Sequence, residues 1–308
     1  MTRQRILLPN MDESRLEALA RRFVPGDGPV EYRALYSGLV NASYRVTRDG
    51  ADFVLRVRAA RGEAPGVDRV WEQRVLERVS AARLAPAVRV CEPVAGVLVT
   101  QWVEGASWTA AQASESAVSV QVAQLARAVH EVPAPQPGRA MNPVLWRDLY
   151  LAALRDATVE VSRQAVILQW TSRAQPLLAE YASLGPSDTC LCHSDLHRHN
   201  IVPGASGLVL LDWEYAHVGD PFWDLAGWAS CCDLNAGARL HLLAAYLQRE
   251  PNRAQVRRLQ LLCGAYDYIC LLWMELYQAA MSARGESSAA AEELSARTRL
   301  LAVRFTSY

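Results

Sequence analysis

The stretch that decides the fold lies in residues 190–216. Residues 190–200 read Cys190-Leu-Cys-His-Ser-Asp-Leu-His-Arg-His-Asn200, and residues 210–216 read Leu210-Leu-Asp-Trp-Glu-Tyr-Ala216. His193, Asp195 and Asn200 follow the spacing H-x-D-x-x-x-x-N, and Asp212 ends an apolar strand-like run. Phosphoryl transfer needs a carboxylate that orients the acceptor hydroxyl and metal ions held against the phosphates. In this stretch Asp195 is the candidate for the orienting carboxylate. The hard oxygens of Asn200 and Asp212 suit Mg²⁺ and are the candidates for the metal site.

A small strand-rich region is predicted upstream. After a short helix led by Asp12, Ser43–Thr47 and Asp52–Arg58 read as strands joined through an Asp-Gly pair, which is a strong hairpin signal. In the second strand apolar residues alternate with Arg56 and Arg58, which predicts one core face and one face that carries cations. A helix over residues 67–83 and a strand over residues 96–103 complete this region.

The rest of the chain has a helical period. Residues 114–129, two stretches within 143–184, a stretch from residue 236 and residues 254–280 predict helices, and residues 189–224 form an island of short strands and turns. The whole pattern predicts an α+β fold. Its small β-rich lobe, residues 1–104, has an antiparallel sheet and one key helix, and its larger, mostly helical lobe covers residues 105–308.

Composition narrows the class of partner. The chain has 308 residues, 51% hydrophobic and 21% charged, and its 32 basic and 32 acidic residues cancel, so no overall field favours nucleic acid or a membrane surface. All basic residues are arginines, so any phosphate-binding cation must be Arg. Seven irregularly spaced cysteines, no membrane-length apolar run and no signal-like start predict a cytoplasmic protein with a small-molecule partner.

Several further segments resemble one enzyme family in the order in which that family uses them. They are Ser37-Gly-Leu-Val-Asn-Ala-Ser-Tyr-Arg-Val46, Phe53-Val-Leu-Arg-Val57, Asp68-Arg-Val-Trp-Glu72 and Thr100-Gln-Trp-Val-Glu-Gly105. Together with residues 190–216 they resemble the aminoglycoside phosphotransferase and choline kinase superfamily, which has a bilobal, protein-kinase-like fold. The resemblance covers most of the chain.

The resemblance implies an enzyme that transfers phosphate from ATP, with Mg²⁺, to a small-molecule alcohol. Asp195 would be the catalytic base, with His193 bracing its loop, and Asn200 and Asp212 would hold the metal. The nucleotide would be bound by residues of the first loop, the second strand, the helix and the hinge: Ser37, Asn41, Arg56, Glu72, Gln101 and Val103. Arg58 lies on the same strand face as Arg56, and only the match to the family motif favours Arg56.

The string Gly219-Asp-Pro-Phe-Trp-Asp-Leu225 and the first loop resemble the choline, ethanolamine and thiamine kinases more than the antibiotic kinases. A quaternary ammonium cannot donate hydrogen bonds, so ring faces and nearby carboxylates must hold it. The candidate pocket residues are Glu214, Trp223, Trp228, Asp267, Trp273, Glu275 and Tyr277. Aromatic residues at helical spacing are equally typical of core packing, and Glu214 fits either a supporting or a substrate-binding role.

Three alternatives stay open at this point. The first is an aminoglycoside or amino-sugar kinase, whose polycationic substrate needs many carboxylates. The second is a catalytically silent nucleotide-binding module. The third is a zinc cluster drawn from Cys190, Cys192, His193, His197 and His199. The paired spacing of closed structural zinc sites is missing there, which favours Cys190 and Cys192 as small apolar residues of the strand entering the loop.

Overall fold

The computed structural model describes residues 13–37, 41–58, 64–185, 188–204, 207–283 and 289–308. Contacts divide the chain into two compact units: residues 1–107 with 200–215, and residues 108–199 with 216–308. The predicted lobe boundary at residues 104 and 105 stays a prediction.

An antiparallel sheet of five strands forms the centre of the first unit. Its strands are β1 (Glu31–Ser37), β2 (Asn41–Arg48), β3 (Ala51–Arg58), β4 (Val88–Glu92) and β5 (Val97–Gln101), in the order β1-β2-β3-β5-β4. The predicted hairpin is confirmed: Asp49 and Gly50 link β2 to β3 with φ of 49° and 74°. Positive φ at both residues is what a two-residue turn of matching twist requires.

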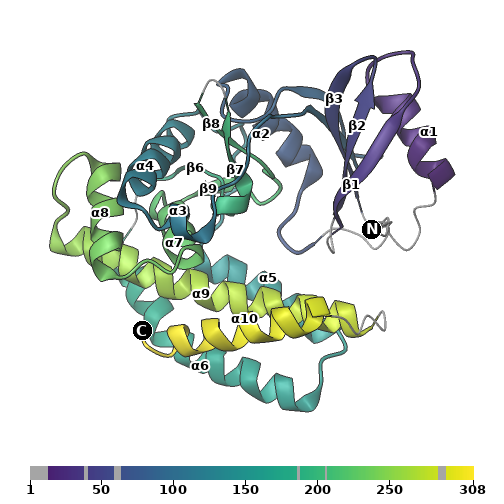
Figure 1. Cartoon of the computed structure of the whole chain (residues 1–308). Helices are drawn as coiled ribbons and strands as arrows, with labels where there is room; N and C mark the ends of the chain where they lie inside the picture. The colour runs from purple at the N-terminus through teal and green to yellow at the C-terminus, as the bar shows by residue number, and fades with distance from the viewer. Residues whose placement is uncertain (1–12, 38–40, 59–63, 186–187, 205–206, 284–288) are drawn as a thin grey trace. The chain divides into compact units, whose positions relative to one another are not determined.

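Two helices flank this sheet, as Figure 1 shows. α1 (Glu13–Phe23) packs its buried residues Leu16 and Ala20 against the apolar face of β2 and β3. α2 (Arg69–Ala81) begins at Asp68, whose carboxylate accepts a hydrogen bond from the Trp71 amide at 3.0 Å. This cap satisfies one of the amides that a helix start leaves unpaired.

Strands β1 and β4 were not predicted, because they are the two edges of the sheet. Neither contains a fully buried side chain among the residues whose exposure is described. Their inward residues Tyr32 and Val90 are only partly buried, and such short, exposed strands give a weak signal in the sequence.

A two-stranded hairpin, β7 (Ile201–Gly204) with β8 (Gly207–Leu210), also belongs to the first unit. The Leu210 amide donates to the Leu84 carbonyl at 2.8 Å, which ties the hairpin to the segment after α2. Gly105, with φ of 151°, lies so close to the hairpin that an added Cβ would stand 2.5 Å from the Pro203 carbonyl oxygen. Only glycine fits at that approach.

The second unit is mostly helical. Its helices are α3 (Ala110–Ala113), α4 (Ser116–His130), α5 (Pro143–Asp156), α6 (Val161–Ser183), α7 (Phe222–Cys231), α8 (Ala236–Leu247), α9 (Arg253–Ser282) and α10 (Ala289–Phe305). Short strands β6 (Cys190–Cys192) and β9 (His217–Gly219) pair antiparallel, and a 3₁₀ turn, η1 (Arg198–Asn200), leads to β7. The sheet and the helical remainder confirm the predicted α+β class.

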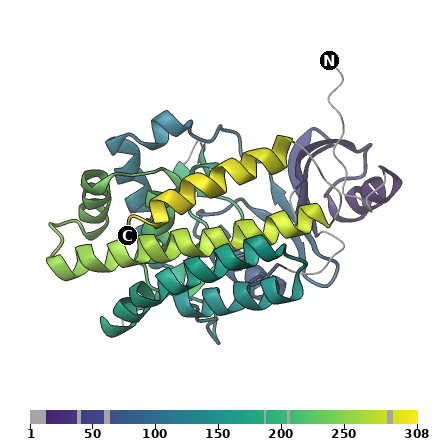
Figure 2. The same cartoon turned by 90° about the horizontal axis from the view of Figure 1, so that it is seen from below.

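The long helix α9 is the core of the second unit. It contacts α5, α6, α7 and α10, and Figure 2 shows it running between α10 on one side and α5 and α6 on the other. α9 is long and apolar enough to cross a membrane by composition alone, but 72% of its most apolar window is buried inside the protein. This burial is typical of a core helix.

Candidate active site

The β7–β8 hairpin brings the two predicted metal ligands to one end. Ile201 pairs with Leu210, and the Leu211 amide donates to the Asn200 carbonyl at 2.7 Å, so Asn200 and Asp212 flank the open end of the hairpin. Asp212 has φ of 61°, an uncommon conformation for a residue other than glycine, and its side chain is 40% exposed. A carboxylate and a carboxamide on adjacent strand ends are hard oxygen donors, and this pair fits Mg²⁺, which keeps several waters of its own.

Arg56 on β3 joins that hairpin to α2. Its Nη2 donates to both carboxylate oxygens of Glu72 at 2.6 Å, and its Nη1 donates to Oδ1 of Asp212 at 3.0 Å. The side chain of Arg56 is only 12% exposed and that of Glu72 only 2%. A buried carboxylate and a paired guanidinium hold each other in place, because either one left alone would be a costly buried charge.

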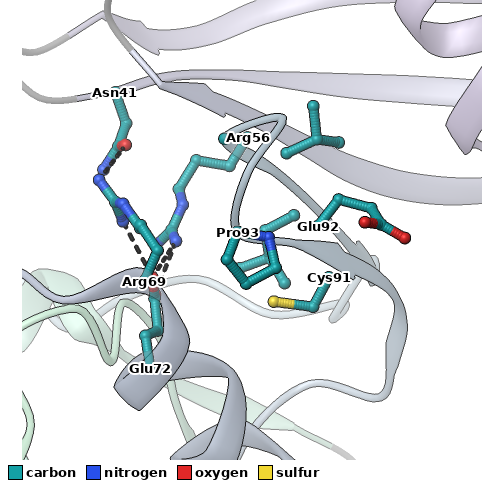
Figure 3. Close-up of a pocket in the computed structure, with 10 residues that line it drawn as sticks. Asn41, Arg56, Arg69, Glu72, Cys91, Glu92 and Pro93 are labelled. Atoms are coloured by element: carbon teal, nitrogen blue, oxygen red, sulfur yellow. Dashed lines mark hydrogen bonds and ion pairs between the residues drawn. The ribbon is translucent and has the colours of Figure 1, made fainter. Parts of the chain in front are cut away.

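A second arginine, Arg69, completes a buried network, and Figure 3 shows the part of it formed by Asn41, Arg56, Arg69 and Glu72. Its Nη1 donates to Glu72 and to Glu214, both at 2.9 Å, and its Nη2 donates to Oδ1 of Asn41 at 2.8 Å. Asn41 in turn donates to Glu214 at 2.5 Å. Sequence reasoning missed Arg69, although its position three residues before Glu72 places both on one face of α2.

The network has more carboxylates than guanidinium groups. Three carboxylates, Asp212, Glu214 and Glu72, face the two guanidinium groups. Burial and the neighbouring charge of Asp212 raise the pKa of Glu214 to about 7, against the opposing effect of the arginines. At that pKa Glu214 is about half protonated at neutral pH, and an added cation beside Asp212 would favour its charged form.

The other predicted nucleotide contacts lie at the sheet ends. The amides of Gln101 and Trp102 are occupied, since they donate to Ala87 at 2.8 Å and to Asp52 at 3.0 Å. Val103 is half-buried just beyond them. Ser37 ends β1, and residues 38–40 of the predicted nucleotide loop lie outside the described residues.

In the second unit, the loop after β6 carries Asp195 and His193. The Asp195 amide donates to Nδ1 of the fully buried His193 at 3.3 Å, and the Asp195 carboxylate lies 3.4 Å from Nε2 of His197. The Asp195 side chain is 29% exposed. Ser194 has φ of 74° and its hydroxyl lies 2.6 Å from Nδ1 of His217, so the loop backbone turns sharply just before Asp195.

Asp224 on α7 holds this loop, and sequence reasoning gave it no role. Its carboxylate accepts hydrogen bonds from the amides of His193 at 2.8 Å and Ser194 at 2.7 Å, and His130 Nε2 lies 3.1 Å away. Asp224 is 1% exposed. Although burial acts in the opposite direction, these hydrogen bonds and the His130 charge lower the pKa of Asp224, so it stays a carboxylate.

The predicted Cys-His cluster is divided by the structure. His193 contacts Asp195, and His197 and His199 stack edge-on with ring centroids 5.8 Å apart. Cys190 and Cys192 instead lie with His130, which sequence reasoning did not consider because it is 60 residues earlier. A hydrogen bond with Cys192 lowers the pKa of Cys190 to about 6, with burial opposing and His130 assisting the shift.

Four of the predicted acceptor residues are buried and already packed or paired. Trp223 and Trp228 are 4% and 0% exposed, and Trp228 packs edge-on against Trp108. Asp267 accepts two hydrogen bonds from Arg304, both at 2.7 Å, and Glu275 is paired with Arg163. Burial and pairing already account for these four residues, so the proposed pocket does not include them.

Trp273 and Tyr277 are different. They are half-buried on one face of α9, and their rings stack with centroids 5.1 Å apart and planes 12° apart. The same helix face carries Cys270 one turn earlier. Burial raises the pKa of the Cys270 thiol, and the charges of Cys231, Asp267 and Asp195 add to the shift.

Asp267→Ala should lower the free energy of unfolding by about 3 kcal/mol, since it leaves the Arg304 guanidinium without its buried partner. Substrate KM values per folded molecule should stay near normal. The matched control is Asp233→Ala, which removes the exposed partner of the same arginine and should cost less than about 1 kcal/mol. Chemical denaturation with parallel kinetics checks both, and a stable Asp267→Ala protein with an altered acceptor KM would return Asp267 to the pocket.

The chain belongs to the phosphotransferase enzyme family, whose model matches residues 31–259. This confirms the superfamily that the motifs indicated, and the enzyme class with it.

Individual relatives add detail. Over 83 residues the chain is 36% identical to thiamine kinase of Escherichia coli, a match that covers 25% of this chain and only 30% of the relative. Among solved structures, the choline kinase LicA of Streptococcus pneumoniae has a TM-score of 0.75 at 18% identity, covering 96% of this chain and 99% of LicA. A choline/ethanolamine kinase family protein of Mesorhizobium loti has a TM-score of 0.68 at 22% identity, covering 94% of each chain. These structures share the kinase-like fold.

Proposed function

We propose that this enzyme transfers the γ-phosphoryl group of ATP, with Mg²⁺, to the hydroxyl of a small cationic alcohol such as choline, ethanolamine or a thiamine-like compound. The observation that carries the proposal is Arg56, whose guanidinium is fixed between Glu72 and Asp212. A buried cation that contacts both a helix glutamate and the candidate metal ligand has the arrangement that phosphate binding needs.

ATP binding is assigned to the first unit. The adenine would bond to the backbone at Val103, beyond the occupied amides of Gln101 and Trp102. Arg56 would meet the phosphates, with Glu72 and Arg69 keeping it in place. Asn200 and Asp212 would hold Mg²⁺, which when bound neutralises charge that develops on the transferred phosphoryl group. LicA has also been solved with AMP bound, which supports a nucleotide as donor.

Asp195 is assigned as the base that orients the acceptor hydroxyl and accepts its proton. The assignment is supported by the partial exposure of the Asp195 side chain and by the hydrogen bond from the Asp195 amide to the buried His193. Asp224 fixes the two amides before Asp195, so the carboxylate is presented by a rigid backbone. Such positioning supplies much of the catalysis in phosphoryl transfer, because little covalent chemistry is required of the protein.

The acceptor head is assigned to the stacked pair Trp273 and Tyr277. Both residues lie on the face of α9 that carries Cys270 one turn earlier. Their rings are half-buried and stack on each other, so each presents its outer face, and an aromatic face suits a quaternary ammonium.

A coupled ADP-release screen over choline, ethanolamine, thiamine, aminoglycosides and amino sugars tests the proposal. Turnover should be highest with one of the first three. Preference for a polycationic aminoglycoside would assign the enzyme to the antibiotic-kinase alternative, and no turnover with any acceptor would favour a silent nucleotide-binding module.

Trp273→Ala should raise KM for the cationic acceptor roughly tenfold or more and leave KM for ATP near normal, because a desolvated cation–π contact contributes about 2 kcal/mol. Trp273→Phe should recover part of the loss, since the smaller ring still presents a negative face. The melting temperature is measured alongside. A large drop in melting temperature with an unchanged ratio of the two KM values would make Trp273 a core residue.

A further inference from the structure

The cluster formed by His130, Cys190 and Cys192 has no part in the proposed reaction. His130 is the last residue of α4, and Cys190 and Cys192 belong to strand β6, which leads directly to His193 of the catalytic loop. Cys190 and Cys192 are two residues apart on a strand, so their side chains share one face. His130 comes to that face from a separate helix.

The spacing of the donor atoms matches a soft metal. The two sulfur atoms are 3.9 Å apart. Two thiolates bound to one zinc ion at about 2.3 Å in tetrahedral geometry stand about 3.8 Å apart. A ring nitrogen of His130 lies within 4.8 Å of both sulfurs, so a modest movement of one side chain completes a three-donor set.

The surroundings are also those of a metal site. His130 keeps its Nε2 3.1 Å from the buried Asp224 carboxylate, and metal-binding histidines typically give their second nitrogen to such a partner. The Tyr246 hydroxyl lies 2.9 Å from Nδ1, so Nδ1 would exchange this partner for the metal ion. Cys192 is fully buried, whereas Cys190 is half-buried and gives access from solvent.

We propose that Cys190, Cys192 and His130 bind a soft cation of the zinc class, and that its binding slows phosphoryl transfer by displacing Asp224 from the catalytic loop. One oxygen atom links the cation site to the catalytic loop. Oδ2 of Asp224 accepts a hydrogen bond from the His193 amide at 2.8 Å and lies 3.1 Å from Nε2 of His130. Movement of His130 toward the sulfurs therefore pulls on the group that holds the backbone before Asp195. The binding of the cation does not depend on the proposed function, whereas the inhibition of phosphoryl transfer rests on it.

Titration of the full-length protein with Cd²⁺ tests binding, because thiolate ligation gives a charge-transfer band in the ultraviolet. One equivalent should produce a two-thiolate band. In Cys190→Ser/Cys192→Ser the affinity should fall by roughly 10²-fold or more, a loss at least as large as that caused by removing an outer hydrogen-bond partner of a metal site. The matched control is Cys231→Ser/Cys232→Ser, which removes the other neighbouring cysteine pair and should bind like the wild type.

Turnover at saturating Mg²⁺ with one added equivalent of Zn²⁺ tests inhibition. The turnover of the wild type and of the control Cys231→Ser/Cys232→Ser should fall roughly tenfold, a loss comparable to removing a supporting contact of a metal or catalytic group. The turnover of Cys190→Ser/Cys192→Ser should not change. Equal inhibition of all three proteins would overturn the link to the loop. A cadmium band that persists in Cys190→Ser/Cys192→Ser, or is missing from the wild type, would overturn the site. A wild type without transferase activity would count against the proposed function, and the cadmium titration would still decide the site.

Discussion

Asp195→Asn should lower kcat by roughly 10²-fold or more while leaving ATP affinity almost unchanged, because only proton acceptance and hydroxyl orientation are lost. The amide is nearly isosteric with the carboxylate, so the hydrogen bond from the Asp195 backbone to His193 should survive. Steady-state kinetics with the best acceptor and a nucleotide-binding titration measure the two effects separately.

Asp148→Asn is the matched control, since it neutralises an exposed carboxylate that pairs only with its neighbour Arg147 among the described contacts. It should behave as the wild type. Near-normal turnover of Asp195→Asn would remove Asp195 as the base and direct attention to another group on the loop.

Asp212→Ala should abolish Mg²⁺-dependent nucleotide binding and lower turnover by about 10³-fold, because a bound metal ion contributes several kcal/mol of charge stabilisation. The substitution also removes the 3.0 Å contact of Arg56, whereas the Glu72 pair remains. Calorimetry of ATP binding with and without Mg²⁺ separates the metal effect from the loss of this contact.

Added zinc should not rescue Asp212→Ala, since the remaining carboxamide of Asn200 is a hard donor. Glu214→Gln provides the comparison, because it changes a buried carboxylate of the same network that contacts Arg69 and Asn41. Full retention of Mg²⁺-dependent binding in Asp212→Ala would contradict the metal assignment.

The elements with a strong period or a strong turn could be predicted from the sequence. The prediction of the β2–β3 hairpin rests on one Asp-Gly pair, and that of α9 rests on an apolar stripe within residues 254–280. The edge strands β1 and β4 were not predicted, because their inward residues Tyr32 and Val90 are only partly buried and the strands are short. The Arg56 and Glu72 pair was expected from the family motif, and the structure places these two side chains in contact.

The partners of buried charges were the main omissions. Arg69 meets Glu214 from 145 residues away, and His130 meets Asp224 from 94 residues away. Such pairs leave no local pattern, since each member looks like an ordinary surface residue in its own segment. The same reason made Asp267 and Glu275 look like substrate carboxylates, when Arg304 and Arg163 pair with them across the second unit.

The most direct test of the account follows the phosphorus atom itself. The protein is incubated with ATP labelled at the γ-phosphorus, Mg²⁺ and each acceptor of the panel, and the products are separated. The label should appear in the phosphate ester of a small cationic alcohol, in an amount equal to the ADP formed, and Asp195→Asn should form almost none. Label that stays in ATP, or appears only as inorganic phosphate with every acceptor, would contradict the proposed function.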